Sequence, residues 1–166
     1  MGMVGSFRRI SARDLARLYA DPDAATEFLG GEGDDTGFDP FADLDVDKAW
    51  HGIHYLLTGS AEEGEPPLDF IVRGGREIGE DLGYGPARGF SPAEVKNIAA
   101  ALSGVSLDQL RSRYDQNEMQ RLQIYPDIWR REPDEGLAYV TQYFDELKEF
   151  ITGGAKEGEA LIVFLT

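Results

Sequence analysis

The sequence contains no cysteine, which excludes disulfide bonds, thiolate zinc sites and cysteine nucleophiles together. The stability of the fold must therefore come from packing. Apolar residues make up 42% of the 166 positions and aromatic residues 11%, which is enough for the core of one domain. We expect a single domain over residues 1–166.

Long apolar runs are also missing, since none approaches the roughly 20 residues that a bilayer-spanning helix needs. The first residues, "MGMVGSFRRISARDL", lack the basic-then-apolar order of a secretory signal. They formally meet the myristoylation pattern M-G-x-x-x-S, but no polybasic second signal follows. The sequence predicts a cytoplasmic protein with no membrane contact.

Basic residues are scarce: 16 lysines and arginines stand against 31 acidic residues, which gives a net charge of −15. This charge repels phosphate backbones, and the arginines between 111 and 131 are interleaved with acids, so no nucleic-acid partner is expected. The charge does favour a basic protein partner through long-range attraction. One hypothesis is thus an acidic inhibitor or immunity-type protein.

Motifs for cofactors and nucleophiles are missing as well. The glycine-rich stretch lacks both GxxxxGK[ST] and a GxGxxG between strand and helix, so no nucleotide cofactor is expected. No serine lies in G-x-S-x-G, and both histidines lie on one predicted helix, so a hydrolase triad has little support.

The elements that are present predict an α+β fold with a small mixed β-sheet of about four strands covered by helices. The sequence predicts strands at residues 3–10, 68–75 and 160–166, and the first and last should be neighbours. The last, "ALIVFLT", is apolar throughout and should lie in the sheet interior. The glycine-rich residues 76–90 are predicted to form a loop. Six helices are expected, among them one opened by a capping box at Ser91 and Glu94.

An acidic loop precedes the helix predicted for residues 46–57. Asp43, Asp45 and Asp47 have the first three ligand spacings of a calcium-binding EF-hand loop, but Lys48 replaces the required glycine and His54 replaces the bidentate glutamate. A calcium site is therefore excluded in this form, and Asp45 is expected to act as the helix N-cap.

The helix itself reads "DKAWHGIHYLLTG" and contains the only two histidines of the chain. Asp47, His51 and His54 are spaced to lie on one helix face, which is the minimum for a divalent metal site. Two other readings stay open: His54 is a half-buried core histidine beside Trp50, or it takes an acid–base or ligand-binding role.

The stretch "GYGPARGF" fixes Tyr84 and Arg88 on a backbone restricted by glycine and proline. Arg88 there is suited to clamp a carboxylate or phosphate, or to bind loop carbonyls or a neighbouring acid. A further cluster, "IYPDIW", contains Tyr125 and Trp129, which line a pocket or cap the edge of the core.

Four stretches together, "MGMVGSF", "LDVDKAWHGIHYLLTG", "GYGPARGF" and "QIYPDIW", resemble the YfbM-like family of small bacterial proteins. The resemblance spans nearly the whole chain and implies a cytosolic α+β domain with no established activity. It matches the family pattern at His54, whereas the position of His51 is an acid in some members. It therefore implies that His54 is of more interest than His51, and it weakens the metal hypothesis.

Our leading hypothesis is a ligand- or partner-binding domain whose site combines three polar-aromatic stretches. The alternative is a hydrolase or transferase for a small anionic substrate, with His54 as acid or base and Arg88 as anion clamp. The candidate ligand-binding residues are Trp50, His54, Tyr84, Arg88, Tyr125 and Trp129.

Overall fold

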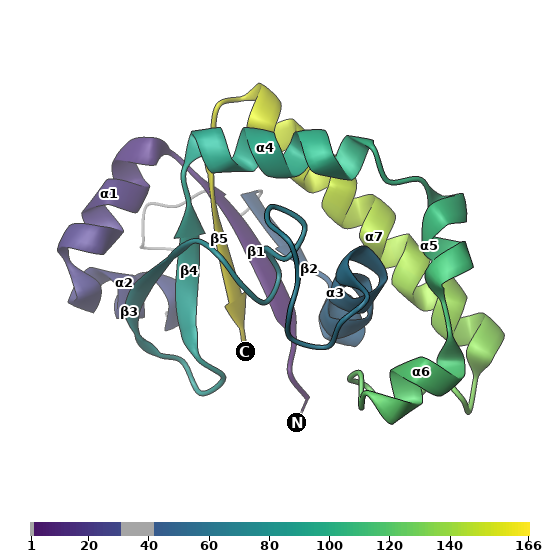
Figure 1. The fold of residues 1–166 in the computed structure, drawn as a ribbon. Helices are drawn as coiled ribbons and strands as arrows, with labels where there is room; N and C mark the ends of the chain where they lie inside the picture. Colours follow the sequence, from purple (N-terminus) through teal and green to yellow (C-terminus); the bar gives the residue numbers. More distant parts are fainter. Residues whose placement is uncertain (1, 31–41) are drawn as a thin grey trace.

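A five-stranded antiparallel sheet forms the centre of the computed structural model, which describes residues 2–30 and 42–166 (Figure 1). The strand order is β2-β1-β5-β4-β3, so the first and the last strand of the chain pair in the middle. The strands are β1 (Gly5–Ile10), β2 (Asp43–Asp45), β3 (Arg76–Asp81), β4 (Pro86–Phe90) and β5 (Ala160–Leu165). The helices are α1 (Ala12–Ala20), α2 (Pro22–Gly30), α3 (Trp50–Thr58), α4 (Pro92–Ser103), α5 (Leu107–Arg113), α6 (Gln116–Arg121) and α7 (Pro133–Lys156), and a 3-10 turn η2 (Asp47–Ala49) precedes α3.

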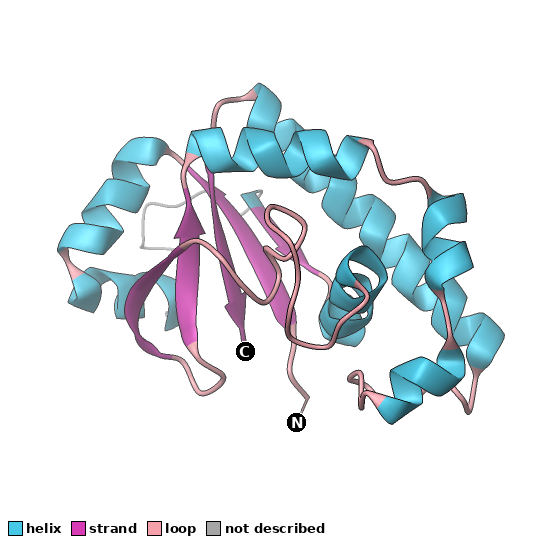
Figure 2. Ribbon diagram, in the orientation of Figure 1, coloured by secondary structure: helices cyan, strands magenta, loops and turns pink. Residues whose placement is uncertain are grey.

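Helices cover both faces of the sheet, with α1 and α2 on one side and α3, α4 and α7 on the other (Figure 2). The central strand β5 explains this arrangement, because its side chains alternate between the two cores. Leu161 and Val163 pack in the larger core with α3, α4 and α7, whereas Ile162 and Phe164 pack in the smaller core with α1 and α2. A strand buried on both faces must be apolar throughout, as "ALIVFLT" is.

The predicted α+β class is confirmed, and so are the pairing of the terminal strands and the interior position of β5. The sheet has five strands where about four were expected, and every pairing is antiparallel. The capping box at Ser91 and Glu94 is present as predicted.

Two local predictions were wrong. Residues 68–75 form turns, although "LDFIVRGG" has the composition of a strand. The strands lie instead in the glycine-rich residues 76–90, where β3 and β4 form a hairpin with an irregularity between Ile78 and Asp81. The glycines accommodate that irregularity within β3 and the tight turn after it, so they mark a bulged hairpin here and not a long loop.

The helix that carries both histidines begins later than predicted. Residues 47–49 form the turn η2, and α3 starts at Trp50. The Asp45 carboxylate accepts a hydrogen bond from the N–H of Asp47 and so binds the start of η2 and not that of α3. Gly59 then ends α3 in a left-handed conformation, as its place after Thr58 predicts. In the described parts of the chain, no helix is both long and apolar enough to cross a bilayer.

Candidate functional site

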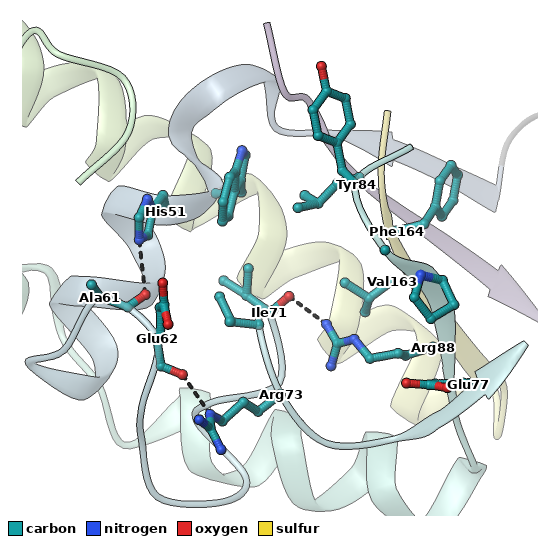
Figure 3. Close-up of a pocket in the computed structure, with 15 residues that line it drawn as sticks. His51, Ala61, Glu62, Ile71, Arg73, Glu77, Tyr84, Arg88, Val163 and Phe164 are labelled. Atoms are coloured by element: carbon teal, nitrogen blue, oxygen red, sulfur yellow. Dashed lines mark hydrogen bonds between the residues drawn. The ribbon is translucent and has the colours of Figure 1, made fainter. Parts of the chain in front are cut away.

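A cleft with a volume of about 490 Å³ lies between the segment 61–73, the end of β5 and the tip of the β3–β4 hairpin (Figure 3). His51, Ala61 and Glu62 lie on one side of it, and Val163, Arg88 and Glu77 lie on the other. The remaining lining residues are Trp50, Ile71, Val72, Arg73, Tyr84, Gly85, Pro86, Phe164 and Leu165. The cleft is thus lined by charged and aromatic side chains together.

The course of β4 accounts for the position of the cleft. Strand β4 pairs with β5 from Phe90 to Arg88, where Arg88 lies opposite Val163. The pairs that would follow in this register are Ala87 with Phe164 and Pro86 with Leu165, and Pro86 has no N–H to extend the ladder. The hairpin therefore separates from β5 at Pro86, and the cleft occupies the space beside Leu165.

Both nitrogens of His51 are occupied by backbone groups. Nε2 lies 2.9 Å from the carbonyl oxygen of Ala61, and Nδ1 lies 2.9 Å from the backbone nitrogen of Tyr125. A carbonyl only accepts and a backbone N–H only donates, so Nε2 carries the proton and Nδ1 is the acceptor. Burial lowers the pKa of His51, in keeping with a neutral imidazole. His51 lines the cleft but has no nitrogen left for a metal or a proton transfer.

His54 lies one turn further along α3 and is fully buried. Its Nε2 lies 3.0 Å from the carbonyl oxygen of Glu63, while Nδ1 has no partner among the described residues. Burial lowers the pKa of His54 to about 4, because the interior disfavours the charged ring. His54 is not among the residues that line the cleft.

Three consecutive carbonyls of the cleft wall are each bound by a side chain. His51 binds that of Ala61, Arg73 donates to that of Glu62 at 2.6 Å, and His54 binds that of Glu63. The two histidines thus hold the same segment to α3. Their spacing on the helix, which suggested a metal site, instead matches the spacing of alternate carbonyls in the chain opposite.

Arg88 holds the second half of this wall. Its Nη1 donates to the carbonyl of Gly74 at 2.9 Å, and its Nη2 donates to those of Phe70 and Ile71 at 3.1 and 2.6 Å. Burial lowers the pKa of Arg88 to about 10, but the group stays charged at neutral pH. Of the roles that the sequence left open, Arg88 takes the one that binds loop carbonyls.

Two of the candidate aromatic residues line the cleft. The ring of Trp50 stacks on His51 with centroids 4.8 Å apart, and its Nε1 donates to the carbonyl of Met3. Tyr84 is 47% exposed at the hairpin tip, between Gly83 and Gly85. Both glycines have positive φ, at 111° and 98°, which a residue with a Cβ rarely adopts. The glycines therefore fix the turn that presents Tyr84 at the cleft.

The other two aromatic candidates support the site from behind or lie elsewhere. Tyr125 packs against Trp50 at 6.2 Å between centroids, and its hydroxyl accepts from the N–H of Met3. Trp129 is fully buried and donates to the carbonyl of Ile124. Neither lines the cleft, so of the six candidate ligand-binding residues the structure brings Trp50, Tyr84 and Arg88 together there.

The metal hypothesis grouped Asp47 with the two histidines. The Asp47 carboxylate accepts a hydrogen bond from the Tyr139 hydroxyl at 2.7 Å, on the side of α7. Among the described residues, no three His, Asp or Glu side chains are arranged to hold a metal ion.

Sequence reasoning did not single out Glu62, Arg73 or Glu77, which contribute three of the charged groups of the cleft. Glu62 belongs to the acidic turn "EEGEPP", and Glu77 lies in the stretch 76–90 that the sequence predicts as a loop. No motif marks these residues. The assignment of β3 and β4 would have been the signal, because it brings Glu77 opposite Arg88.

Comparison with known proteins identifies the family. The chain resembles the solved structure of YfbM from Escherichia coli, a protein of unknown function, with a TM-score of 0.73 and 18% identity over 98% of this chain and 99% of that chain. This likeness shows a shared fold. No curated protein matches the sequence. A family model described as a domain of unknown function, DUF1877, matches residues 1–164, and the chain belongs to that family.

Proposed function

We propose that the protein is a binding module that takes up a small organic ligand, or a side chain of a partner protein, in the cleft beside Trp50 and Tyr84. The observation that carries this proposal is the occupation of every imidazole and guanidinium group at the cleft by backbone groups. Groups fixed in this way shape a site, and the one imidazole that lines the cleft, His51, has no nitrogen left for a proton transfer.

Three features of the cleft support binding. Its volume of about 490 Å³ lies within the range of small-molecule sites. Apolar surface from Ile71, Val163 and Leu165 lies next to charged groups, as in most such sites. The wall formed by segment 61–75 is held to α3 and β4 by side chains from several elements, which favours a preformed site.

A catalytic alternative is less favoured by the same contacts. It required His54 as an acid or base, but this ring is fully buried and its Nε2 binds the Glu63 carbonyl. It also required Arg88 as an anion clamp, but three carbonyls already accept from this guanidinium.

The experiment that tests the proposal is a fragment screen by amide NMR with the whole protein. We expect the fragments that bind to shift the signals of residues 61–73 and 84–88, and Tyr84→Ala to weaken their binding about fivefold or more. Gln142→Ala, a surface change on α7, should leave their affinity unchanged. Fragments that bind only elsewhere, or equally to Tyr84→Ala, would contradict the proposal.

A further inference from the structure

We infer that the ligand of this cleft is cationic, with an organic ammonium or guanidinium group on an apolar body. The inference rests on the proposed function and concerns the charge that the site selects. It starts from the carboxylates at the cleft that make no hydrogen bond or ion pair with the described residues. The carboxylates of Glu62 and Glu77 line opposite sides of the cleft (Figure 3). Both residues are exposed, and within the described part of the chain neither carboxylate accepts a hydrogen bond or forms an ion pair within 4.0 Å, although the charge of Glu77 acts on Arg88.

The fold itself uses several of the donors at the cleft, in contrast. Arg73 gives its Nε proton to the Glu62 carbonyl and pairs through Nη2 with Glu63 at 2.6 Å. His51 gives its proton to the Ala61 carbonyl. A ligand therefore meets two carboxylates without a donor beside arginines whose donors are partly used by the fold, a setting that suits an N–H-bearing cation.

Arg88 is poorly placed to bind an anionic ligand. A carboxylate binds most tightly when it accepts two hydrogen bonds along one edge of the guanidinium plane. Both N–H groups of Nη2 already donate to the carbonyls of Phe70 and Ile71, so neither edge that includes Nη2 is open. An anion would have to displace these carbonyls, which would then lie at the cleft wall without a donor.

The charge around the cleft also favours a cation. Arg73 is paired with Glu63, and Asp69 and Glu77 act on Arg88 by their charge. The lining itself holds two carboxylates and two guanidinium groups, and the two further acids that act on these arginines from next to the cleft make the count four to two. These groups are Glu62, Glu63, Asp69 and Glu77 against Arg73 and Arg88. The net charge of −15 on the whole chain adds attraction at longer range.

The aromatic side chains complete the site. The exposed ring of Tyr84 lies at the cleft, where a cation placed over its face gains cation–π attraction. The apolar part of the ligand would pack on Ile71 and Leu165, which line the cleft together with Trp50. An ammonium on a short apolar body satisfies all three kinds of group at once.

The test uses three probes that share one body: phenethylamine, 3-phenylpropionate and 2-phenylethanol. Their affinities for the full chain are measured by calorimetry at low salt. We expect the amine to bind about tenfold more tightly than the other two, and we expect added salt to reduce the difference. Glu62→Gln/Glu77→Gln should abolish most of this preference.

The control is Glu135→Gln/Glu149→Gln, which makes the same change of charge on exposed positions of α7 and should keep the preference. A blocked lysine, Nα-acetyl-lysine amide, distinguishes the source of the cation. Binding as tight as that of phenethylamine assigns it to a partner's side chain, and weaker binding assigns it to a free amine.

Tighter binding of the propionate or the alcohol, or an unchanged preference in Glu62→Gln/Glu77→Gln, would overturn the inference and leave the proposed function standing. Failure of all probes to bind would also overturn the inference. The proposed function is tested separately, by the fragment screen.

Discussion

Nε2 of His54 lies 3.0 Å from the carbonyl oxygen of Glu63, and this contact fastens the cleft wall to the core. His51 makes the equivalent contact with Ala61 three residues earlier on the same helix. A pair of imidazoles that suggested a metal site is thus a pair of hydrogen-bond donors to one chain segment. The following predictions test what these contacts contribute.

His54→Ala should lower the free energy of unfolding by about 2–4 kcal/mol, because it leaves a cavity and removes the donor from the Glu63 carbonyl. His54→Gln keeps an N–H near the position of Nε2 and should cost markedly less. Urea denaturation of the three proteins measures both values, with Gln142→Ala as the surface control. Equal losses in the two His54 variants would show that packing, and not the hydrogen bond, is what His54 supplies.

Stability should fall on acidification because of His54. Its pKa is about 4 in the folded protein and near 6.5 in an unfolded chain, so the unfolded state binds the proton more readily. The stabilising contribution is complete above pH 6.5 and is lost as the pH falls from 6.5 to 4, with a total of roughly 3 kcal/mol. The pKa of His51 is lowered too, so that residue adds in the same direction.

Denaturation at several pH values between 8 and 5 checks this expectation. The curve of His54→Gln should be flatter than that of the wild type below pH 6.5, because glutamine does not titrate. Parallel curves would mean that His54 has an ordinary pKa in the folded state.

The sequence sufficed for the parts of the fold that depend on local patterns. The capping box of Ser91 and Glu94 is a local signal, and the apolar run of β5 follows from burial on both faces. The hairpin of β3 and β4 was missed because glycines at its irregularity and turn resemble loop composition. Its strand character depends on pairing with β5, which is far away in the sequence.

The candidate site was predictable in part for the same reason. Helical spacing placed His51 and His54 on one face, and both contact segment 61–63; the glycine-rich stretch pointed to Tyr84 and Arg88, which line the cleft. The carbonyl partners of His51, His54 and Arg88 belong to the backbone, which every residue has, so no residue type in the sequence marks them. Which histidine reaches the cleft therefore depended on the course of segment 61–73, and the structure brings His51 there, where the family pattern had favoured His54.

Arg88→Lys should loosen the cleft wall even though it keeps the charge. One ammonium cannot reach the carbonyls of Phe70, Ile71 and Gly74 together, so at least one of them loses its donor. We expect a loss of about 1–3 kcal/mol in unfolding free energy and faster amide exchange in residues 69–75. Arg111→Lys, at an exposed pair with Asp108, is the matched control and should change neither. Unchanged exchange in Arg88→Lys would mean that these bonds do not hold the wall.

Gly52 allows α3 to approach the ring of Trp129, which is why this tryptophan belongs to the core and not to the cleft. A Cβ at position 52 would lie 2.7 Å from Cη2 of Trp129 and 3.1 Å from a methyl carbon of Val140. Because both neighbours are fully buried, they have little room to move.

Gly52→Ala should therefore lower the unfolding free energy by about 1–3 kcal/mol, despite the higher helix propensity of alanine. The fluorescence of Trp129, measured in a Trp50→Phe background to remove the second tryptophan, should shift as the ring is displaced. Gly104→Ala is the control, since its Cβ would meet only the Ala101 carbonyl at 3.5 Å and its φ of −82° suits alanine. Gly52→Ala with a stability equal to that of Gly104→Ala would show that α3 can move away from Trp129 at little cost, and the position of His51 and His54 against segment 61–63 would then be adjustable as well.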